Sequence, residues 1–279
     1  MNVPIVFVHR GNQEFLQYSI LQSAKSNPKS KIYLLGDESN QSFSDLAKNV
    51  VWKNCSDYED DRIEEFAKNY KHMSTNPAQF EFLCFYRWFI LNNFLSTIKQ
   101  EYIFYADSDV LVFDDVTQKE RFYKDYRLTL SHRYCPNSMY IKNDGILGEY
   151  LSLVEGIYGG DNPIGFEKCK DHYERLQRFN KPGGVCDMTL WEIFNVKNEN
   201  PGFIGEMSSV FDDETFDHNI NASDGYQMQT EGPLKIKKIA IEDNNLYGFL
   251  KSGRKVKFLS LHFQGNAKFL MQNIYKSLK

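Results

Sequence analysis

The chain has 279 residues, of which 42% are hydrophobic and 22 are phenylalanines, so it is long and apolar enough to bury a large core. A formal net charge of −4 excludes an overall basic field, so no nucleic acid partner is expected. No stretch rich in proline, serine or glycine divides the sequence, which predicts a single domain spanning residues 1–279.

The N-terminal third has the pattern of alternating strands and helices. Between the first two strands, apolar residues at helical spacing predict a helix that ends at Asn27-Pro28. Ser42 is expected to cap a short helix through Ala47. Strands that alternate with helices form right-handed βαβ units, so we expect a mainly parallel sheet. The apolar runs that predict its first strands are 5–8, 32–35 and 50–52.

The remaining elements follow from the same patterns. Residues 57–69 predict a charged helix, and Pro77 begins a long helix through Leu95, which leads into a buried strand that starts at Tyr102. Residues 145–157 predict a helix or a loop with helical turns. The stretch 198–232 has weak periodicity, and so long a loop in a compact domain is usually functional. Further strands are expected at 127–131, 236–241, 246–250 and 256–263, and a closing helix at 269–278.

Two aspartates end the strand that starts at Tyr102, in the sequence Asp107-Ser108-Asp109. Two carboxylates at the end of a buried strand are unfavourable unless a positive charge lies between them. A divalent metal held by hard oxygen ligands, and shared with a phosphate-bearing substrate, would meet this need. The distant segment from Leu261 to Lys268 offers the other groups of such a site.

The ends of three predicted strands carry polar residues. Ligands of an open parallel sheet bind beyond the carboxyl ends of its strands. The first strand ends at His9-Arg10-Gly11-Asn12, the second at Gly36-Asp37 and the fourth at Asp107-Ser108-Asp109. These three ends are expected to line one crevice, which has the outline of a nucleotide site.

Four short segments of the chain resemble a GT-A glycosyltransferase. Asp107-Ser108-Asp109 follows an apolar strand, and Arg87 lies one helix upstream. The segment His262-Phe263-Gln264-Gly265-Asn266-Ala267-Lys268 is similar to the HxxGxxK pattern of the glycogenin-like retaining group. The segments Val8-His9-Arg10-Gly11-Asn12 and Leu34-Leu35-Gly36-Asp37 are similar to bacterial and viral sugar transferases of this fold.

The resemblance implies an α/β fold of the GT-A (Rossmann-like) type, with a mostly parallel central sheet flanked by helices. Residues 1–113 would form the nucleotide-binding half, and residues 114–279 the acceptor-binding half with its C-terminal metal and diphosphate segment. The implied activity is metal-dependent transfer of a sugar from a nucleoside-diphosphate sugar, with a UDP-sugar expected, to a glycan or other hydroxyl acceptor. Retention is favoured, but Phe269-Leu270 follows Lys268 where that group has Pro-Trp, so inversion stays open.

The resemblance also implies residue roles. Asp107, Asp109 and His262 would ligate Mn²⁺ or Mg²⁺, and Lys268 with the Gly265 backbone would hold the diphosphate. A metal and a lysine there stabilise the charge that develops on the leaving group. Asp37 would lie near the base or ribose, or else form only a turn. Arg87 would reach the phosphates or donor sugar, or else pair with a buried carboxylate. The implied donor-binding residues are Val8, His9, Asp37, Arg87, Asp107, Ser108, Gly265 and Lys268.

Asp187 is the predicted catalytic side chain. It follows Gly183-Gly184, which allow close backbone approach to a ligand, and it begins a helix through Phe194. In related transferases an acidic residue in this region faces the donor sugar and the acceptor. Asp187 would act as a base for inversion or would orient the sugar for retention, and an ordinary N-cap aspartate is the alternative.

Two other functions remain open. A haloacid-dehalogenase-like phosphatase also places two aspartates after an apolar strand, but Leu111 stands where that group has threonine or valine. A non-catalytic nucleotide-sugar-binding protein is the second alternative. The five scattered cysteines predict reduced thiols in a cytoplasmic protein, and neither a signal peptide nor a membrane span is expected. Basic residues near the C-terminus between Lys235 and Lys257 suggest a face for phosphates, for weak contact with an anionic membrane surface, or merely for solvent.

Overall fold

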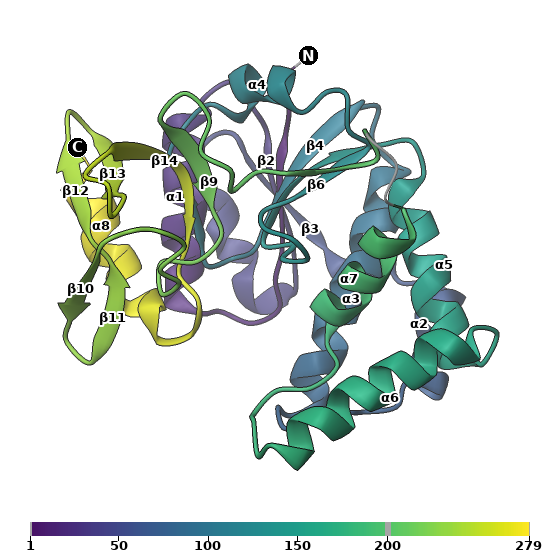
Figure 1. Ribbon diagram of the computed structural model, residues 1–279. Helices are drawn as coiled ribbons and strands as arrows, with labels where there is room; N and C mark the ends of the chain where they lie inside the picture. The colour runs from purple at the N-terminus through teal and green to yellow at the C-terminus, as the bar shows by residue number, and fades with distance from the viewer. Residues whose placement is uncertain (1, 199–201, 279) are drawn as a thin grey trace.

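The computed structural model describes residues 2–198 and 202–278. Its central sheet has seven strands in the order β3-β2-β1-β4-β7-β6-β8 (Figure 1). All neighbours pair in parallel except β7, which is antiparallel to both β4 and β6. The carboxyl ends of the other strands therefore lie at one edge, as the sequence predicted for the first, second and fourth. The strands are β1 (Ile5–Val8), β2 (Ile32–Gly36), β3 (Val50–Asn54), β4 (Tyr102–Ala106), β6 (Leu128–Leu130), β7 (Ser138–Lys142) and β8 (Ile204–Glu206).

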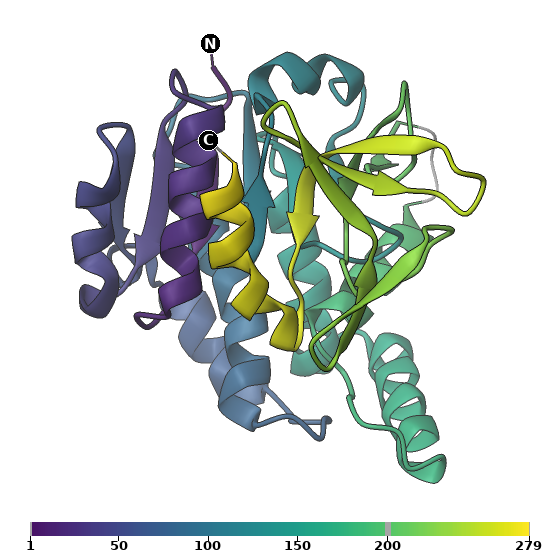
Figure 2. The same cartoon turned by 90° about the vertical axis from the view of Figure 1, so that its left-hand side faces the viewer.

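Helices cover both faces of this sheet, and strands β2 and β4 are accordingly buried along their whole length. Ile5 and Phe7 pack on one face with helix α1, whereas Val6 packs on the other with helices α3 and α5. Helix α6 extends away from the sheet in both views (Figures 1 and 2). The α-helices are α1 (Glu14–Ser26), α2 (Asp61–Asn69), α3 (Ala78–Leu95), α4 (Val116–Lys119), α5 (Ile146–Gly159), α6 (Pro163–Arg178), α7 (Asp187–Lys197) and α8 (Met271–Ser277). Short 3₁₀ helices are η1 (Glu38–Leu46), η2 (Cys55–Tyr58), η3 (Glu120–Phe122) and η4 (Gly265–Leu270).

A second sheet brings the C-terminal part of the chain against the end of β4. Its order is β12-β13-β14-β5, with β9 also pairing with β14. Because β5 follows β4 directly but belongs to the other sheet, Asp107-Ser108-Asp109 forms the junction between the two sheets. Helix α8 lies beside α1 (Figure 2). The strands outside the central sheet are β5 (Val110–Val112), β9 (Glu214–Asp217), β10 (Met228–Glu231), β11 (Leu234–Lys237), β12 (Ile239–Glu242), β13 (Asn245–Phe249) and β14 (Lys255–His262).

Several predicted elements need correction. The segment 198–232 is not a structureless loop, because it contains β8, β9 and β10; its residues 199–201 lie outside the described residues. The single strand predicted at 236–241 is two strands separated at Lys238. The short helix before β3 is 3₁₀ and is capped by Asp37, not Ser42, because the Asp37 carboxylate accepts the Ser39 amide. Strand β7 and helix α6 were not predicted.

Within the described residues, no helix is both long enough and apolar enough to cross a membrane. The fold expected from the sequence is confirmed as a single α/β domain with a mostly parallel central sheet.

Candidate functional site

Three predicted metal ligands meet at the junction of the two sheets. Asp107 follows β4 and Asp109 precedes β5, while His262 ends β14 and stands opposite Val110 in the β14–β5 pairing. One ligand atom from each of the three side chains lies within 4.8 Å of the others. Strand pairing thus brings together residues that are more than a hundred positions apart, and the grouping agrees with the prediction.

The imidazole of His262 is oriented as in a metal-binding histidine. Its Nδ1 donates to the backbone carbonyl of His218 at 2.8 Å, and this leaves Nε2 facing Asp109 Oδ1 at 3.2 Å. Metal ligands of this type usually have their second ring nitrogen held by such a carbonyl. Asn137 Nδ2 donates to the same carbonyl at 2.8 Å, and this second hydrogen bond fixes the position of the carbonyl.

The two aspartates have opposite electrostatic environments. Burial raises the pKa of Asp107, and the charge of Asp109 adds to the rise, although Arg87 opposes it. Burial alone would also raise the pKa of Asp109, but His262 and then Lys268 hold it well below its usual range. Burial would lower the pKa of His262, yet the Asp109 carboxylate raises it above its usual value. Each group therefore depends on the charges of its neighbours.

This donor set fits a hard divalent cation. Asp107 Oδ2 has no hydrogen-bond partner in the described part of the chain, and Asp109 and His262 complete a set of carboxylate oxygens and one imidazole nitrogen. Mn²⁺ and Mg²⁺ are bound by oxygen donors, and imidazole is a common additional ligand of first-row metals. The residues present therefore suit the metal that the sequence led us to expect.

Arg87 joins Asp107 to Asp187. Its guanidinium donates to Asp107 Oδ1 and, at 2.5 Å, to Asp187 Oδ2. The Tyr105 hydroxyl donates to Asp107 Oδ1 at 2.6 Å, and the indole of Trp88 donates to Asp187 Oδ2 at 2.9 Å. Burial would lower the pKa of Arg87, but Asp107 and its other neighbours raise it. Of the two roles considered for Arg87, the structure shows the pairing with buried carboxylates.

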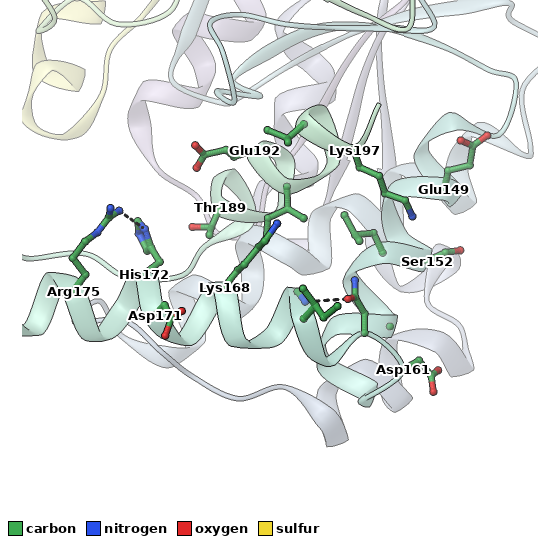
Figure 3. A pocket seen from close by; sticks show the side chains of 17 residues that line it. Glu149, Ser152, Asp161, Lys168, Asp171, His172, Arg175, Thr189, Glu192 and Lys197 are labelled. Atoms are coloured by element: carbon green, nitrogen blue, oxygen red, sulfur yellow. Dashed lines mark hydrogen bonds between the residues drawn. The ribbon is translucent and has the colours of Figure 1, made fainter. Parts of the chain in front are cut away.

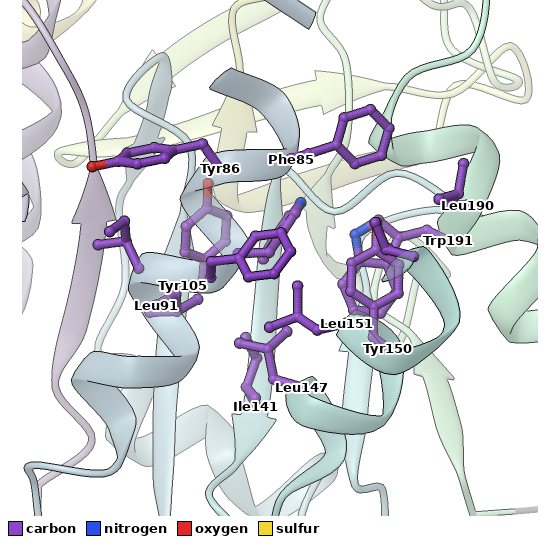
Figure 4. Close-up of a cluster of buried hydrophobic side chains, with 14 of the residues drawn as sticks. Phe85, Tyr86, Leu91, Tyr105, Ile141, Leu147, Tyr150, Leu151, Leu190 and Trp191 are labelled. Carbon is purple, nitrogen blue, oxygen red and sulfur yellow. The ribbon is translucent and has the colours of Figure 1, made fainter. Parts of the chain in front are cut away.

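Asp187 is enclosed instead of open to a substrate. It is 2% exposed and is the first residue of α7, where Oδ1 accepts the Met188 amide at 2.9 Å. Behind it, Trp191 stacks on Tyr150 with ring centroids 3.6 Å apart (Figure 4). Both carboxylate oxygens of Asp187 already accept hydrogen bonds, and one of these bonds holds the Arg87 guanidinium in position. Its predicted catalytic role stays a prediction.

Val8 and His9 lie at the carboxyl end of β1, and Ser108 follows β4, so all three are at the edge of the sheet where the sequence placed them. His9 follows β1, and its pKa is lowered by burial, although the charge of nearby Asp109 opposes this change. Val8 is half-buried at the end of β1. The Ser108 carbonyl accepts the Ser19 hydroxyl at 2.6 Å, which attaches the junction to α1.

The other predicted donor-binding residues have structural contacts as well. Asp37 accepts a hydrogen bond from the Gly11 amide at 2.8 Å. Burial would raise the pKa of Asp37, but hydrogen bonds from Ser39 and Gly11 lower it below its usual value. Gly265 is exposed at the start of η4 with a φ of +60°, which favours glycine. Lys268 Nζ lies 3.1 Å from Asp109 Oδ2 and 4.9 Å from the Phe15 ring centroid.

Sequence reasoning missed the residues that hold the predicted ones in place. Asn137, Tyr105 and Trp88 contact His218, Asp107 and Asp187, respectively, but no sequence pattern distinguishes them from core residues. The start of helix α6 was also missed, although Asn162-Pro163 signals it, because Asn162 caps α6 and proline is favoured at the first helical position.

The C-terminal basic face is weaker than the sequence suggests. Lys237 is fully buried against Asp217 and Asp224, and Lys257 contacts Asp114 at 2.7 Å. Arg254 and Lys255 pair with acidic residues too. These pairs reduce the positive charge available to a phosphate or a membrane surface.

A separate groove of about 1060 Å³ lies between α5, α6 and α7 (Figure 3). Its walls carry both acidic and basic side chains, among them Glu149, Asp171, Arg175 and Glu192. None of the predicted site residues lines it. This groove is therefore not the predicted donor site.

Gly184 approaches the chain's own backbone, not a ligand. A Cβ at this position would lie 2.2 Å from the Met73 carbonyl oxygen and 2.3 Å from Ser74 Cα. Gly184→Ala is therefore expected to lower the free energy of unfolding by about 1–3 kcal/mol, measured by urea denaturation. In the control Gly159→Ala, no heavy atom lies within 4 Å of the added Cβ, and a change within about 0.5 kcal/mol is expected. Equal effects of the two variants would contradict this interpretation.

No known family profile matches the sequence, and no curated protein matches it in sequence. The structure is similar to mouse xyloside xylosyltransferase 1 in its apo form, with a TM-score of 0.50 at 8% identity over 77% of this chain and 88% of that one. The galactosyltransferase LgtC, solved with donor and acceptor sugar analogues, matches with a TM-score of 0.47 at 12% identity over 99% and 96% of the two chains. Glycosyltransferase GlyE of Streptococcus pneumoniae TIGR4 matches with a TM-score of 0.42 at 14% identity over 71% and 44%. The first likeness supports the GT-A fold expected from the sequence.

Proposed function

We propose that this protein is a metal-dependent glycosyltransferase that moves a sugar from a nucleoside-diphosphate sugar, expected to be a UDP-sugar, to a hydroxyl group of a glycan. The observation that carries the proposal is the convergence of Asp107, Asp109 and His262 at the carboxyl edge of a GT-A sheet. A nucleotide bound at this edge would place its diphosphate beside these groups.

The residues of this site have complementary tasks in the proposed reaction. Asp107, Asp109 and His262 would hold Mn²⁺ or Mg²⁺, which when bound stabilises negative charge on the diphosphate. Lys268 exchanges its contact with Asp109 for one with a phosphate oxygen and adds positive charge where the leaving group develops its charge. Arg87, held by Asp187, keeps Asp107 in position.

The direct test measures release of nucleoside diphosphate, in the presence of Mn²⁺, from a panel containing UDP-glucose, UDP-galactose, UDP-xylose, UDP-N-acetylglucosamine and GDP-mannose. Water and p-nitrophenyl glycosides serve as acceptors. Release of nucleoside diphosphate with formation of a new glycoside is expected, and proton NMR of the product gives its anomeric configuration. A phosphatase would release inorganic phosphate instead, and a non-catalytic protein would bind the donors without turnover.

Lys268→Ala is expected to weaken the binding of UDP in the presence of Mn²⁺. A hydrogen bond to a charged group contributes about 1.5–3 kcal/mol, and the lower value is expected here because the side chain is 36% exposed. Isothermal titration calorimetry measures the change. Lys276→Ala, an exposed lysine on α8, is the matched control and should bind UDP as the wild type does. Unchanged affinity in Lys268→Ala would refute the phosphate contact.

A further inference from the structure

A second group of polar side chains continues the carboxyl edge of the central sheet. Because β6 and β8 run in the same direction as β4, the residues that follow them lie at the same edge as Asp107. His132 follows β6, and Glu206 ends β8 opposite Leu130. The edge that carries the metal ligands therefore extends into the half of the chain expected to bind the acceptor.

His132 is held by one ring nitrogen and not by the other. Its Nδ1 lies 2.9 Å from Glu206 Oε1 and 3.0 Å from Ser208 Oγ. Its Nε2 has no hydrogen-bond partner within residues 2–198 and 202–278, and the side chain is 30% exposed. A carboxylate on one nitrogen with the other nitrogen open is the arrangement that orients a histidine for proton transfer.

Glu206 is fixed and charged. Its Oε2 accepts the backbone amide of Arg133 at 3.3 Å, and Arg133 has a φ of +46°, which is unusual for a residue with a side chain. Burial would raise the pKa of Glu206, but the hydrogen bonds from His132 and Arg133 lower it. An ionised Glu206 favours the proton on Nδ1 of His132 and leaves Nε2 as the acceptor.

The His132–Glu206 pair lies next to the metal centre. The His132 ring stacks on the His218 ring, with centroids 4.4 Å apart, and the His218 carbonyl holds His262. On the same loop, burial and then the nearby carboxylates of Asp187 and Asp107 together raise the pKa of Cys135 to about 12. The loop after β6 is thus within the electrostatic reach of Asp107.

We propose that His132, oriented by Glu206, accepts the proton of the acceptor hydroxyl during transfer. This inference rests on the proposed function and assigns its proton acceptor. The hydroxyl oxygen forms a bond to the anomeric carbon of the sugar, and its proton moves to His132 Nε2. The bond between the anomeric carbon and the diphosphate oxygen breaks, and its electron pair leaves on that oxygen. The imidazolium then returns its proton to water.

The protonation pattern of His132 can be measured without any substrate. Nitrogen–proton correlation spectra of ¹⁵N-labelled protein, recorded at alkaline pH, distinguish the two neutral tautomers, and the spectrum of His132→Gln assigns the signal. The expected result is a neutral imidazole with its proton on Nδ1, which shifts towards the other tautomer in Glu206→Gln. A wild-type His132 protonated at Nε2 would overturn the proposal, because that nitrogen could not accept a proton.

The kinetic test uses the donor of the panel that turns over fastest, with Mn²⁺ and with water or a p-nitrophenyl glycoside as acceptor. His132→Gln is expected to lower kcat by about 10²–10⁴-fold, the usual contribution of a general base, with unchanged UDP affinity by calorimetry. Added imidazole is expected to restore part of the activity of His132→Ala, which a merely structural role would not allow. His72→Gln, an exposed histidine, is the matched control and should retain wild-type kcat.

The outcomes separate this inference from the proposed function. If the wild type transfers sugar and His132→Gln has nearly the same kcat, His132 is not the proton acceptor and the glycosyltransferase proposal still stands. If the wild type releases no nucleoside diphosphate from any donor of the panel, both proposals are overturned.

Discussion

Asp109→Ala is expected to reduce sugar transfer by more than about 100-fold, because loss of residues that only support a metal ligand already lowers affinity or activity about 10–100-fold. Asp109 is the carboxylate that faces both His262, at 3.2 Å, and Lys268, at 3.1 Å. Its removal takes away one metal ligand and the carboxylate that Lys268 contacts. Initial rates measured over a range of Mn²⁺ concentrations should show that added metal does not restore activity.

Chelation gives the corresponding result for the wild type. Excess EDTA is expected to abolish transfer, and Mn²⁺ added afterwards should restore it.

The control for Asp109→Ala is Asp45→Ala, which removes an exposed carboxylate outside the site and should have wild-type rates. Circular dichroism is expected to show that Asp109→Ala remains folded. Full activity in excess EDTA would exclude the metal assignment and leave the three ligands without a function in this reaction.

Arg87→Met is expected to lower the free energy of unfolding by about 3–5 kcal/mol, as is typical when one partner of a buried ion pair is removed. The Arg87 side chain is 18% exposed and lies between Asp107 and Asp187, which are 19% and 3% exposed. Without the guanidinium, two carboxylates face each other in a poorly solvated site. Urea denaturation measures the loss.

A double-mutant cycle tests whether Asp187 is the partner that matters. Asp187→Asn keeps an oxygen for the Trp88 indole but removes the charge, so the variant with both substitutions should recover part of the stability that Arg87→Met loses. Arg62→Met is the control. It breaks the ion pair with Glu155, in which the arginine side chain is more than a third exposed, and it should lower the free energy of unfolding by about 1 kcal/mol or less. Additive effects of Arg87→Met and Asp187→Asn would show that the two residues are not coupled.

The same Asp187→Asn variant addresses the role predicted from sequence. A general base would contribute about 10²–10⁴-fold to turnover, with donor affinity intact and an inverted product. The burial of Asp187 and its bonds to Arg87 and Trp88 favour the other role, in which the donor KM rises because Arg87 and Asp107 are displaced. If neither turnover nor donor affinity changes, Asp187 acts only in the packing of α7.

The fold was largely predictable because buried parallel strands and amphipathic helices leave strong local patterns. The strands at 5–8, 32–35 and 50–52 and the helix after Pro77 lie where their apolar residues indicated. The errors lie where the local pattern is weak. Residues 138–142 form a strand that was not predicted although Pro136-Asn137 precedes it. Within 198–232, β8 and β9 pair with strands far away in the chain, whereas β10 pairs with the adjacent β11.

The sequence by itself determined which residues could hold a metal and at which edge of the sheet they would lie. Two aspartates at the end of a buried strand require compensation, and a histidine and a lysine near the C-terminus were the available partners. Burial, charge and strand direction account for the two aspartates. The roles of His262 and Lys268 came instead from the resemblance of their segment to the HxxGxxK pattern.

Only the tertiary structure decided what each side chain contacts. Arg87 lies between Asp107 and Asp187, and His132 meets Glu206, because packing of separate elements brings together residues that the chain itself holds far apart. Periodicity reports which face of an element is buried, but not which side chain of another element lies against it. The distinction between an open catalytic carboxylate and an enclosed one at Asp187 therefore could not be made before the positions of α3 and α7 were known.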